Sequence, residues 1–472
     1  MANSLSFRIL FALIGMFGLE VSQIDIKTAF LYGKRKKPLF VHFPQGHSQK
    51  QTGKVLKTLT SVYGLCDAPR RWYKRILSFF SQRGFQVCPK DPCLFFHSEK
   101  TLYVVIYVDD MLLAATHRDD LKWISNEFKQ EFNLNETNIL DKYVGFEVEC
   151  TSKGVFLSCN KYIEGVLKRI ELNYCKTLKV PGLKGAIVTK DSPLLSSKTK
   201  YQSFVGVLNF ISGLCRPDIS FATNSVARES SSPRMASLKH AKRIFKYLRG
   251  TKKYGIFYKR LGDKKAIHLE VYTDSDFAAD TTSRRSTTGF VALLNGSPLD
   301  WKSKKQAVVA QSTFEAEFIA LAHAMESGQL ILDILQFLQV SPQLPIHVHC
   351  DNQAALHAFR KNEVTKRSRH VDVKYHKIKN LVDKKLFSLK YISTEDNHAD
   401  ILTKNTCFRV FSHHVSRLLR RWSKTGGVMK RVMHAHMRSQ DTACTQDGNV
   451  VNNTTQMRTK SRQPGNYVKR RC

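Results

Sequence analysis

The period of the hydrophobic positions changes several times along the first part of the chain. An unbroken apolar run, Ile9–Leu19, predicts a buried helix, because its eleven residues are too few to span a bilayer. Apolar residues alternate with polar ones around Asp25, and this pattern predicts a half-buried strand. Two β-branched and aromatic runs within residues 102–116 flank Asp109 and Asp110, which predicts a β-hairpin with both acids at its turn.

The later part of the chain contains both helical and strand periods. Residues 200–250 have the helical period, whereas residues 266–404 alternate between strand and helix patterns. Two short alternating runs end in an acid, one in Asp274 and the other in Asp351. We expect these two acids to meet at one edge of a sheet.

A predicted helix start between these two strands carries two glutamates. Ser312 and Glu315 have the spacing of a capping box, in which the glutamate side chain bonds back to the backbone of the cap. Because this gives Glu315 a structural task, Glu317 is the better candidate for a metal ligand. Asp400, which opens another predicted helix, is a fourth candidate acid.

The composition favours a folded protein with a polyanionic partner. The 472 residues carry 75 Lys and Arg against 39 Asp and Glu, a formal charge of +36, and 42% of them are hydrophobic. This apolar content excludes wholesale disorder, and the length suffices for about three domains. The positive charge favours nucleic acid first and an anionic membrane second, with a solvated lysine-rich surface as the alternative that needs no partner.

The cysteines and the N-terminus bear on the compartment. The eleven cysteines include no C-x-x-C pair, so the sequence predicts reduced, buried thiols instead of a disulfide framework or a zinc site. No small-residue cleavage site follows the N-terminal apolar run. We therefore expect no secretion signal and a cytoplasmic or nuclear protein.

The composition changes after Lys404. Residues 405–472 contain 14 Lys and Arg but only two acids, and polar residues dominate from Ser439 onward. A segment with so little apolar surface cannot offset its loss of chain entropy, so we predict a disordered basic tail over residues 405–472. Within it, residues 408–422 have the pattern of one short basic helix.

The predicted hairpin turn places two negatively charged side chains next to each other. Adjacent carboxylates repel each other and resist desolvation, so Asp109 and Asp110 need a compensating charge. A divalent cation is the obvious candidate, with an ordinary acidic surface turn as the alternative. Residues 61–73 (SVYGLCDAPRRWY) group glycine, proline, arginine and aromatic residues, which suit close backbone approach, stacking and phosphate pairing.

These segments carry a resemblance to a known family. QIDIKTAFL around Asp25, SVYGLCDAPRRWY and YVDD, in this order, resemble the reverse transcriptase of copia-type LTR retrotransposons. Residues 268–404, which contain YTDSDFAAD, STFEAEFIAL, HCDNQAAL and ADILTK, resemble the ribonuclease H domain of the same elements. The resemblance implies an α+β right-hand polymerase palm and thumb with incomplete fingers, followed by an α/β ribonuclease H-like domain.

The resemblance also implies domain boundaries. Partial fingers and the palm would occupy residues 1–178, and the thumb or connection would occupy residues 179–265. The ribonuclease H domain would extend over residues 266–404, with the basic, disordered tail over residues 405–472.

Individual residues take roles from the same resemblance. Asp25, Asp109 and Asp110 would hold two Mg²⁺ ions, for which Mn²⁺ is an alternative. Phe30 matches an aromatic position under the incoming sugar, where a bulky ring excludes a 2′-hydroxyl. The other implied substrate-binding residues are Tyr63, Gly64, Arg70 and Arg71. The implied catalytic metal ligands of the ribonuclease H site, again for two Mg²⁺ ions, are Asp274, Glu317, Asp351 and Asp400.

The implied function is RNA-directed DNA synthesis combined with cleavage of the RNA strand of RNA–DNA hybrids by two-magnesium phosphoryl transfer. The expected partners are an RNA template, a DNA primer, the RNA–DNA hybrid and dNTPs, with no membrane. The alternative is an N-truncated nucleic-acid-binding remnant that lacks polymerase activity and retains at most ribonuclease H activity. It is motivated by the family's basic fingers segment, most of which would precede this chain.

Overall fold

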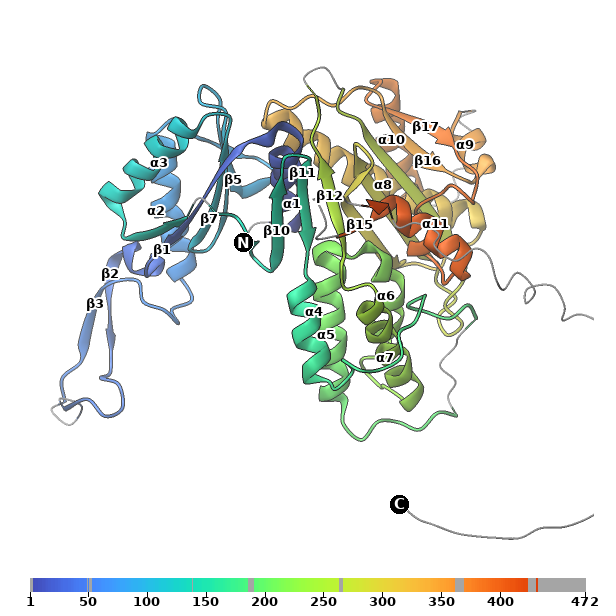
Figure 1. The fold of residues 1–472 in the computed structure, drawn as a ribbon, viewed down its shortest axis with the longest axis horizontal. Coiled ribbons are helices and arrows are strands. Elements are labelled where there is room, and N and C mark those ends of the chain that lie inside the picture. Colours follow the sequence, from blue (N-terminus) through green and yellow to red (C-terminus); the bar gives the residue numbers. More distant parts are fainter. Residues whose placement is uncertain are drawn as a thin grey trace, which may run out of the picture. The chain divides into compact units, whose positions relative to one another are not determined.

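The computed structural model describes residues 3–48, 50, 53–137, 139–185, 191–262, 266–360, 369–422 and 430–431. Within these ranges, three larger sheets and one two-stranded ribbon are connected by helices (Figure 1). The ribbon pairs β2 (Lys34–Val41) with β3 (Leu56–Thr60). Most of the predicted tail, residues 423–429 and 432–472, lies outside the described residues.

The first sheet is antiparallel and contains the strand and the hairpin predicted near the acids. Its strand order is β4 (Gln86–Cys88), β5 (Asp91–His97), β6 (Leu102–Tyr107), β7 (Asp110–Ala115), β1 (Glu20–Ile26) and β8 (Leu134–Thr137). Helices α2 (Ala68–Gln82) and α3 (Arg118–Glu131) cover one face (Figure 1). In an aromatic cluster at this interface, Phe79 of α2 stacks on Phe128 of α3 at 4.4 Å, and Phe80 of α2 stacks on Phe95 of β5 at 4.5 Å, which joins the helices to each other and to the sheet.

The predicted N-terminal helix forms and is buried. Helix α1 (Ser4–Leu13) continues into a π-helical segment, η1 (Ile14–Gly18), and all residues from Leu5 to Met16 are buried. Phe7 and Phe11 contact Tyr143 edge to face, with ring centroids 5.5 and 6.4 Å apart. The apolar run is therefore a core helix, as its length predicts.

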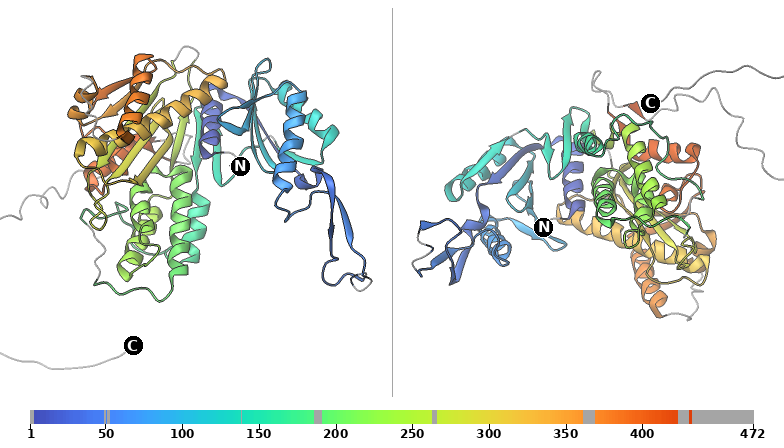
Figure 2. Two further views of the ribbon diagram at one scale, coloured as in Figure 1. Left: turned by 180° about the vertical axis from the view of Figure 1, so that it is seen from behind. Right: turned by 90° about the horizontal axis from the view of Figure 1, so that it is seen from below.

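A second sheet lies next to a group of helices. Its order is β19 (Lys430–Arg431), β18 (Arg420–Arg421), β12 (Tyr254–Lys259), β11 (Gly154–Ser158), β10 (Phe146–Thr151) and β9 (Lys142–Tyr143). Helices α4 (Asn160–Arg169), α5 (Lys198–Cys215), α6 (Ser220–Ala227) and α7 (Met235–Gly250) pack beside one another (Figures 1 and 2). The helices predicted over residues 200–250 are confirmed, and α7 buries its apolar face.

The third sheet is mixed, and α-helices pack on it. Its order is β15 (Ser297–Lys305), β14 (Thr287–Leu294), β13 (Leu269–Asp276), β16 (Ile346–Cys350) and β17 (Phe387–Tyr391). The first three strands are antiparallel, whereas β13, β16 and β17 run parallel. Helices α8 (Thr313–Phe337), α9 (Gln353–Arg360) and α10 (Arg369–Asp383) complete the predicted α/β arrangement. The assignment of the other sheets to fingers, palm and thumb stays a prediction.

Helix α8 is long and apolar enough to cross a membrane, yet it is a core helix. Of its most apolar window, 72% is buried inside the protein. It packs against β13 and β14. Burial of this extent explains the apolar sequence without a membrane.

The predicted boundary at the start of the tail is wrong, because the fold continues to Trp422. Helix α11 (Phe408–Leu418) forms within the segment predicted as one short helix, and it buries an apolar face. Strand β18 then pairs with β12, and the ring of Trp422 stacks on Phe156 at 5.4 Å. The helix itself is confirmed, but the average composition of residues 405–472 does not show that it packs into the fold.

A buried arginine joins α1 to two other elements. Arg8 is 3% exposed, and it donates hydrogen bonds to the carbonyl oxygens of Leu299 in β15 and Gly213 in α5. Its Nη2 lies 3.6 Å from Asp300 Oδ1, and its guanidinium lies 4.3 Å from the Trp301 ring centroid. Burial lowers the pKa of Arg8, although Asp300 opposes this shift. Because a buried charge must keep its partners, these contacts hold α1 in place.

Replacing Arg8 with Met should lower the free energy of unfolding by about 2–4 kcal/mol, because the carbonyls of Leu299 and Gly213 lose their donor. Urea unfolding followed by circular dichroism measures this change. The control is Arg118→Met, since Arg118 is 59% exposed and lies 3.9 Å from Glu20; it should change stability by less than about 0.5 kcal/mol. Equal stability of the Arg8 variant and the wild type would contradict the role given to Arg8.

Candidate active sites

The first sheet brings three carboxylates together. Asp25 on β1 and Asp110 on β7 are direct partners in the antiparallel register. Asp109 belongs to the two-residue turn between β6 and β7, and its carbonyl oxygen accepts a hydrogen bond from the backbone N–H of Ile26 at 3.0 Å. Burial raises the pKa of Asp110, and the charges of Asp109 and Asp25 add to this effect. We call these three acids the first carboxylate cluster.

The turn that carries Asp109 is strained and supported from two sides. Val108 has a φ of +61°, which is rare for a β-branched residue and costs about 1–3 kcal/mol. The indole N–H of Trp72 on α2 donates to the carbonyl oxygen of Val108 at 2.6 Å. The hydroxyl of Tyr143 on β9 lies 3.2 Å from the carbonyl oxygen of Asp110. Trp72, which the sequence groups with stacking residues, is therefore a buried support of the turn.

Two aromatic residues lie beside the first carboxylate cluster. The rings of Phe30 and Tyr63 are 4.8 Å apart between centroids, and Tyr63 is 55% exposed. Burial raises the pKa of the Tyr63 hydroxyl, and the charges of Asp109 and Asp25 raise it further. This electrostatic effect identifies Tyr63 as a neighbour of the carboxylates.

The remaining residues predicted to bind substrate are placed differently. Gly64 has a φ of +96° with open space where a Cβ would stand, so its conformation, not a close contact, favours glycine. Arg71 donates to Asp67 Oδ2 at 2.7 Å and to the carbonyl oxygen of Lys34 at 3.2 Å, so Asp67 already neutralises it. Arg70, next to it on α2, is exposed.

The parallel pairing of β13 with β16 sets two further acids next to each other. Thr273 and Cys350 are partners in this register, so the residues that follow them, Asp274 and Asp351, lie at the same edge. The prediction that the first strand ends at Asp274 is wrong, since β13 continues to Asp276. Beyond Asp274, β13 pairs only with β14, whereas its pairing with β16 ends at Thr273. Asp274 and Asp351 therefore still lie next to each other, as expected.

Glu317 and Asp400 complete a second carboxylate cluster with Asp274 and Asp351. A carboxylate oxygen of Glu317 on α8, one of Asp351 and the sulfur of Cys350 all lie within 4.8 Å of one another. Asp400 begins the 3₁₀ turn η5 (Asp400–Leu402), is 3% exposed, and its charge acts on Asp274.

Glu315 has the structural role that its spacing predicts. Ser312 Oγ accepts from the backbone N–H of Glu315 at 3.1 Å, which caps α8. The Glu315 carboxylate accepts from the backbone N–H of Gln311 at 2.8 Å, one residue before the cap. Glu317, two residues later on the helix, points instead to the second carboxylate cluster.

Burial dominates the electrostatics of the second carboxylate cluster. It raises the pKa values of Asp274 and Glu317 well above those of exposed carboxyls, and Asp351 raises both further. Lys404 opposes this, because its ammonium lies 2.6 Å from Asp400 Oδ1 and its charge lowers the pKa of Asp274. The hydroxyl of Thr403 donates to Asp274 Oδ2.

Sequence reasoning missed Lys404 and Thr403. The signal that could have found Lys404 is its spacing of four residues from Asp400, which favours an ion pair within a helical turn. His398 could be expected to assist proton transfer because it precedes Asp400 by two residues. The structure instead packs its ring against Tyr272 and His414, where burial lowers the pKa of His398 to about 4.

Both carboxylate clusters have the chemistry of a site for a divalent cation. Carboxylate oxygens are the ligands that Mg²⁺ prefers, and each cluster gathers at least three. In the second cluster, the buried Oε2 of Glu317 has no hydrogen-bond partner among the residues that the structure describes. An added cation would satisfy this oxygen and offset the repulsion between the acids.

Comparisons with known proteins give the chain its relatives. Residues 2–184 match a family model described as reverse transcriptase (RNA-dependent DNA polymerase). Over 419 residues, the chain is 33% identical to "Retrovirus-related Pol polyprotein from transposon TNT 1-94" of Nicotiana tabacum. The matched region covers 84% of this chain but only 31% of that protein. Over 308 residues, it is 31% identical to the "Putative transposon Ty5-1 protein" of Saccharomyces cerevisiae, covering 64% of the chain and 99% of that protein.

Solved structures of other proteins also match part of the chain. LC11-RNase H1 is 21% identical and covers 29% of this chain and 92% of its own. The TM-score is 0.23, a value too low to carry weight for fold or function.

Replacing Glu317 with Gln should stabilise the protein at high pH when divalent cations are chelated. The pKa of Glu317 is raised in the folded state, so its carboxyl favours folding at low pH, and this contribution is lost as pH rises above the ordinary carboxyl value of 4.5. The variant should therefore unfold at higher urea concentration than the wild type at pH 8.5 in EDTA, and the difference should shrink toward pH 5.

The matched control is Glu315→Gln on the same helix. It weakens a cap, so it should lower stability slightly, by up to about 1 kcal/mol. A Glu317→Gln variant that is less stable than the wild type at pH 8.5 would contradict the electrostatic description of the second carboxylate cluster.

Proposed function

The chain belongs to the reverse transcriptase family of copia-type transposon Pol polyproteins, and we propose that it is an RNA-directed DNA polymerase that also cleaves the RNA strand of RNA–DNA hybrids. The observation that carries the proposal is the grouping of acids into two clusters by two different sheets. Phosphoryl transfer requires positioning and charge stabilisation more than covalent chemistry, and clustered carboxylates supply both once metal ions are bound.

In the proposed polymerase site, the first carboxylate cluster holds two Mg²⁺ ions, with Mn²⁺ as an alternative. The ions would lower the pKa of the primer 3′-hydroxyl and neutralise the triphosphate. Asp25 and Asp109 would be the principal ligands of these ions, and Asp110 would complete the site. The register of β1 and β7 fixes their spacing, and the supported turn at Val108 prevents Asp109 from moving away when the charges repel.

Phe30 and Tyr63 would form the floor under the incoming nucleotide. Their rings lie together beside the carboxylates, and Tyr63 is exposed enough to contact a ligand. A ring at Phe30 would leave no room for a 2′-hydroxyl and would favour dNTPs over rNTPs. Arg70 is exposed and free to meet a phosphate, whereas Arg71 would first have to leave Asp67.

In the proposed ribonuclease H site, Asp274, Glu317, Asp351 and Asp400 hold two Mg²⁺ ions for hydrolysis of the RNA strand. Thr403 orients Asp274, and Lys404 opposes the rise in the pKa of Asp400 that burial causes. A hybrid is recognised by its shape and its 2′-hydroxyls, so no base-reading element is needed. The net charge of +36 suits binding to the template, the primer and the hybrid, and a cytoplasmic or nuclear location fits these partners.

Polymerase activity should depend on the turn of the first sheet. Wild-type protein should extend oligo(dT) on poly(rA) with dTTP and Mg²⁺, and Asp109→Ala with Asp110→Ala should reduce incorporation at least about 1000-fold. The chain offers a matched control, Asp119→Ala with Asp120→Ala, an adjacent pair at the start of α3 that is bound by Lys122 and Lys100. The control should keep its activity within about twofold. Equally low incorporation by all three proteins would contradict the polymerase assignment and leave the nucleic-acid-binding alternative.

Cleavage of a labelled RNA–DNA hybrid should depend on the second carboxylate cluster alone. Asp351→Asn should abolish cleavage, while the variant of the first carboxylate cluster should retain it. Asp396→Asn is the control, because Asp396 is 67% exposed and contacts Ser393 and His413. Unchanged cleavage by Asp351→Asn would refute the assignment of this site.

A further inference from the structure

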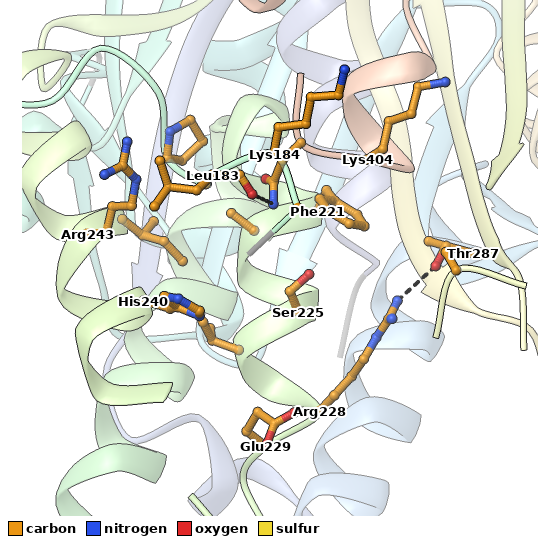
Figure 3. A pocket seen from close by; sticks show the side chains of 18 of the residues that line it. Leu183, Lys184, Phe221, Ser225, Arg228, Glu229, His240, Arg243, Thr287 and Lys404 are labelled. Carbon is orange, nitrogen blue, oxygen red and sulfur yellow. Dashed lines mark hydrogen bonds between the residues drawn. The ribbon is translucent and has the colours of Figure 1, made fainter. Parts of the chain in front are cut away.

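A pocket lies beside the second carboxylate cluster, between the helices of the preceding segment and the third sheet. Its volume is ≈ 450 Å³, and α6, α7, residues 181–185 and the residues around Asp276 line it (Figure 3). Lys404, which contacts Asp400, also lines this pocket. The pocket therefore shares a wall with the proposed ribonuclease H site, although no residue in the role of a metal ligand lines it.

Three acids line this pocket, Asp276, Asp280 and Glu229, and cationic groups act on each of them. Asp280 lies 3.1 Å from Lys305 Nζ and 3.6 Å from Arg228 Nη1. Arg228 also donates to Thr287 Oγ1 at 3.0 Å, so it is held at the wall (Figure 3). The charges of Lys404 and Arg228 act on Asp276. The charges of Arg234, Lys305 and Arg228 act on Glu229 as well, so the cations on this side of the pocket are already opposed by acids.

The opposite side carries basic groups without an acid. The Nε of Arg243 is buried and has no hydrogen-bond partner among the described residues. His240, one helical turn before it on α7, has its pKa lowered by burial and then by the Arg243 charge. Lys184, on residues 181–185, also lines the pocket, but its side chain extends away from Arg243 and His240 (Figure 3). The Arg243 side chain as a whole is half-buried, but its Nε–H is a buried donor without a partner, and an anion in the pocket could accept a hydrogen bond from it.

The segment that carries Lys184 is held in place. The side-chain amide of Asn405 donates to the carbonyl oxygen of Leu183 at 3.1 Å. A Cβ on Gly182 would lie only 1.8 Å from Asn405 Oδ1, so any other residue here would displace the Asn405 side chain from this contact. The pocket is therefore formed before any ligand enters, which reduces the entropic cost of binding.

We propose that this pocket is a subsite for one nucleotide, with its phosphate at Arg243 and His240 and its sugar or base against Phe221. The planar guanidinium binds two phosphate oxygens at once, and a volume near 450 Å³ lies within the range of small-ligand pockets. The proposal rests on the proposed function, because it takes the ligand to be a nucleotide. The ligand has two possible sources that present the same phosphate group. One is a nucleotide within a strand bound at the second carboxylate cluster, and the other is a free mononucleotide.

The test compares variants of the full chain in EDTA, where no cleavage occurs. Arg243→Gln with His240→Gln removes the anion-binding groups. The control, Lys239→Gln with Lys242→Gln, removes two charges from exposed positions of the same helix. Fluorescence anisotropy with a labelled RNA–DNA hybrid, between about 50 and 200 mM KCl, measures affinity and its salt dependence. Calorimetric titration with AMP measures binding of a free nucleotide, and thermal unfolding shows that each variant is folded.

If the pocket holds a nucleotide of a strand, the Arg243 and His240 variant should bind the hybrid about tenfold more weakly. The plot of log K against log salt concentration should also become less steep, by about one unit of slope. The control should change affinity by less than about twofold. If the pocket holds a free nucleotide, AMP binding should be lost in the variant and kept in the control. Affinities for both hybrid and AMP that match those of the control would overturn the proposal.

The binding test of the subsite can be separated from the tests of polymerase and ribonuclease activity. A chain that neither extends primers nor cleaves hybrids, but that loses hybrid or AMP affinity in the Arg243 and His240 variant, would refute the proposed activities and leave the subsite standing. Activity without any effect of these substitutions on binding would refute the subsite alone.

Discussion

Repulsion between gathered carboxylates is the constraint on which the rest of this structure depends. Three acids meet on the first sheet and four on the third, and burial raises the pKa of Asp110, Asp274 and Glu317. Each cluster lowers the stability of the folded chain until positive charge enters it. Lys404 supplies one positive charge to the second cluster, and the proposed metal ions would supply the rest.

The first and third sheets both hold repelling carboxylates close together, but they do so with different strand topologies. In the first, an antiparallel register and a strained two-residue turn place the acids, and Trp72 holds the turn through the carbonyl oxygen of Val108. In the third, parallel strands end side by side, and a long buried helix adds Glu317 from above the sheet edge. In both, the scaffold around the acids is apolar and tightly packed, so the acids cannot separate to relieve their repulsion.

The elements that carry the acids were predictable because they depend on local patterns. Alternation predicted β1, two runs around YVDD predicted the hairpin, and the spacing of Ser312 and Glu315 correctly separated the capping glutamate from Glu317. What could not be predicted depends on tertiary contacts. The burial of α11 after residue 404 depends on residues distant in sequence, whereas the pairing of Arg71 with Asp67 has the local spacing of four residues that could have indicated it. Composition averaged over a segment, as in residues 405–472, hides such contacts.

The central claim is that the chain has two separate sites for divalent cations. Titration with Mn²⁺, followed by the loss of its free electron paramagnetic resonance signal, counts them directly in the folded protein. The wild type should bind Mn²⁺ at two groups of sites, of which one is lost in the Asp109→Ala, Asp110→Ala variant and the other is weakened in Asp351→Asn. Binding that is absent in the wild type, or that remains unchanged in both variants, would contradict the account.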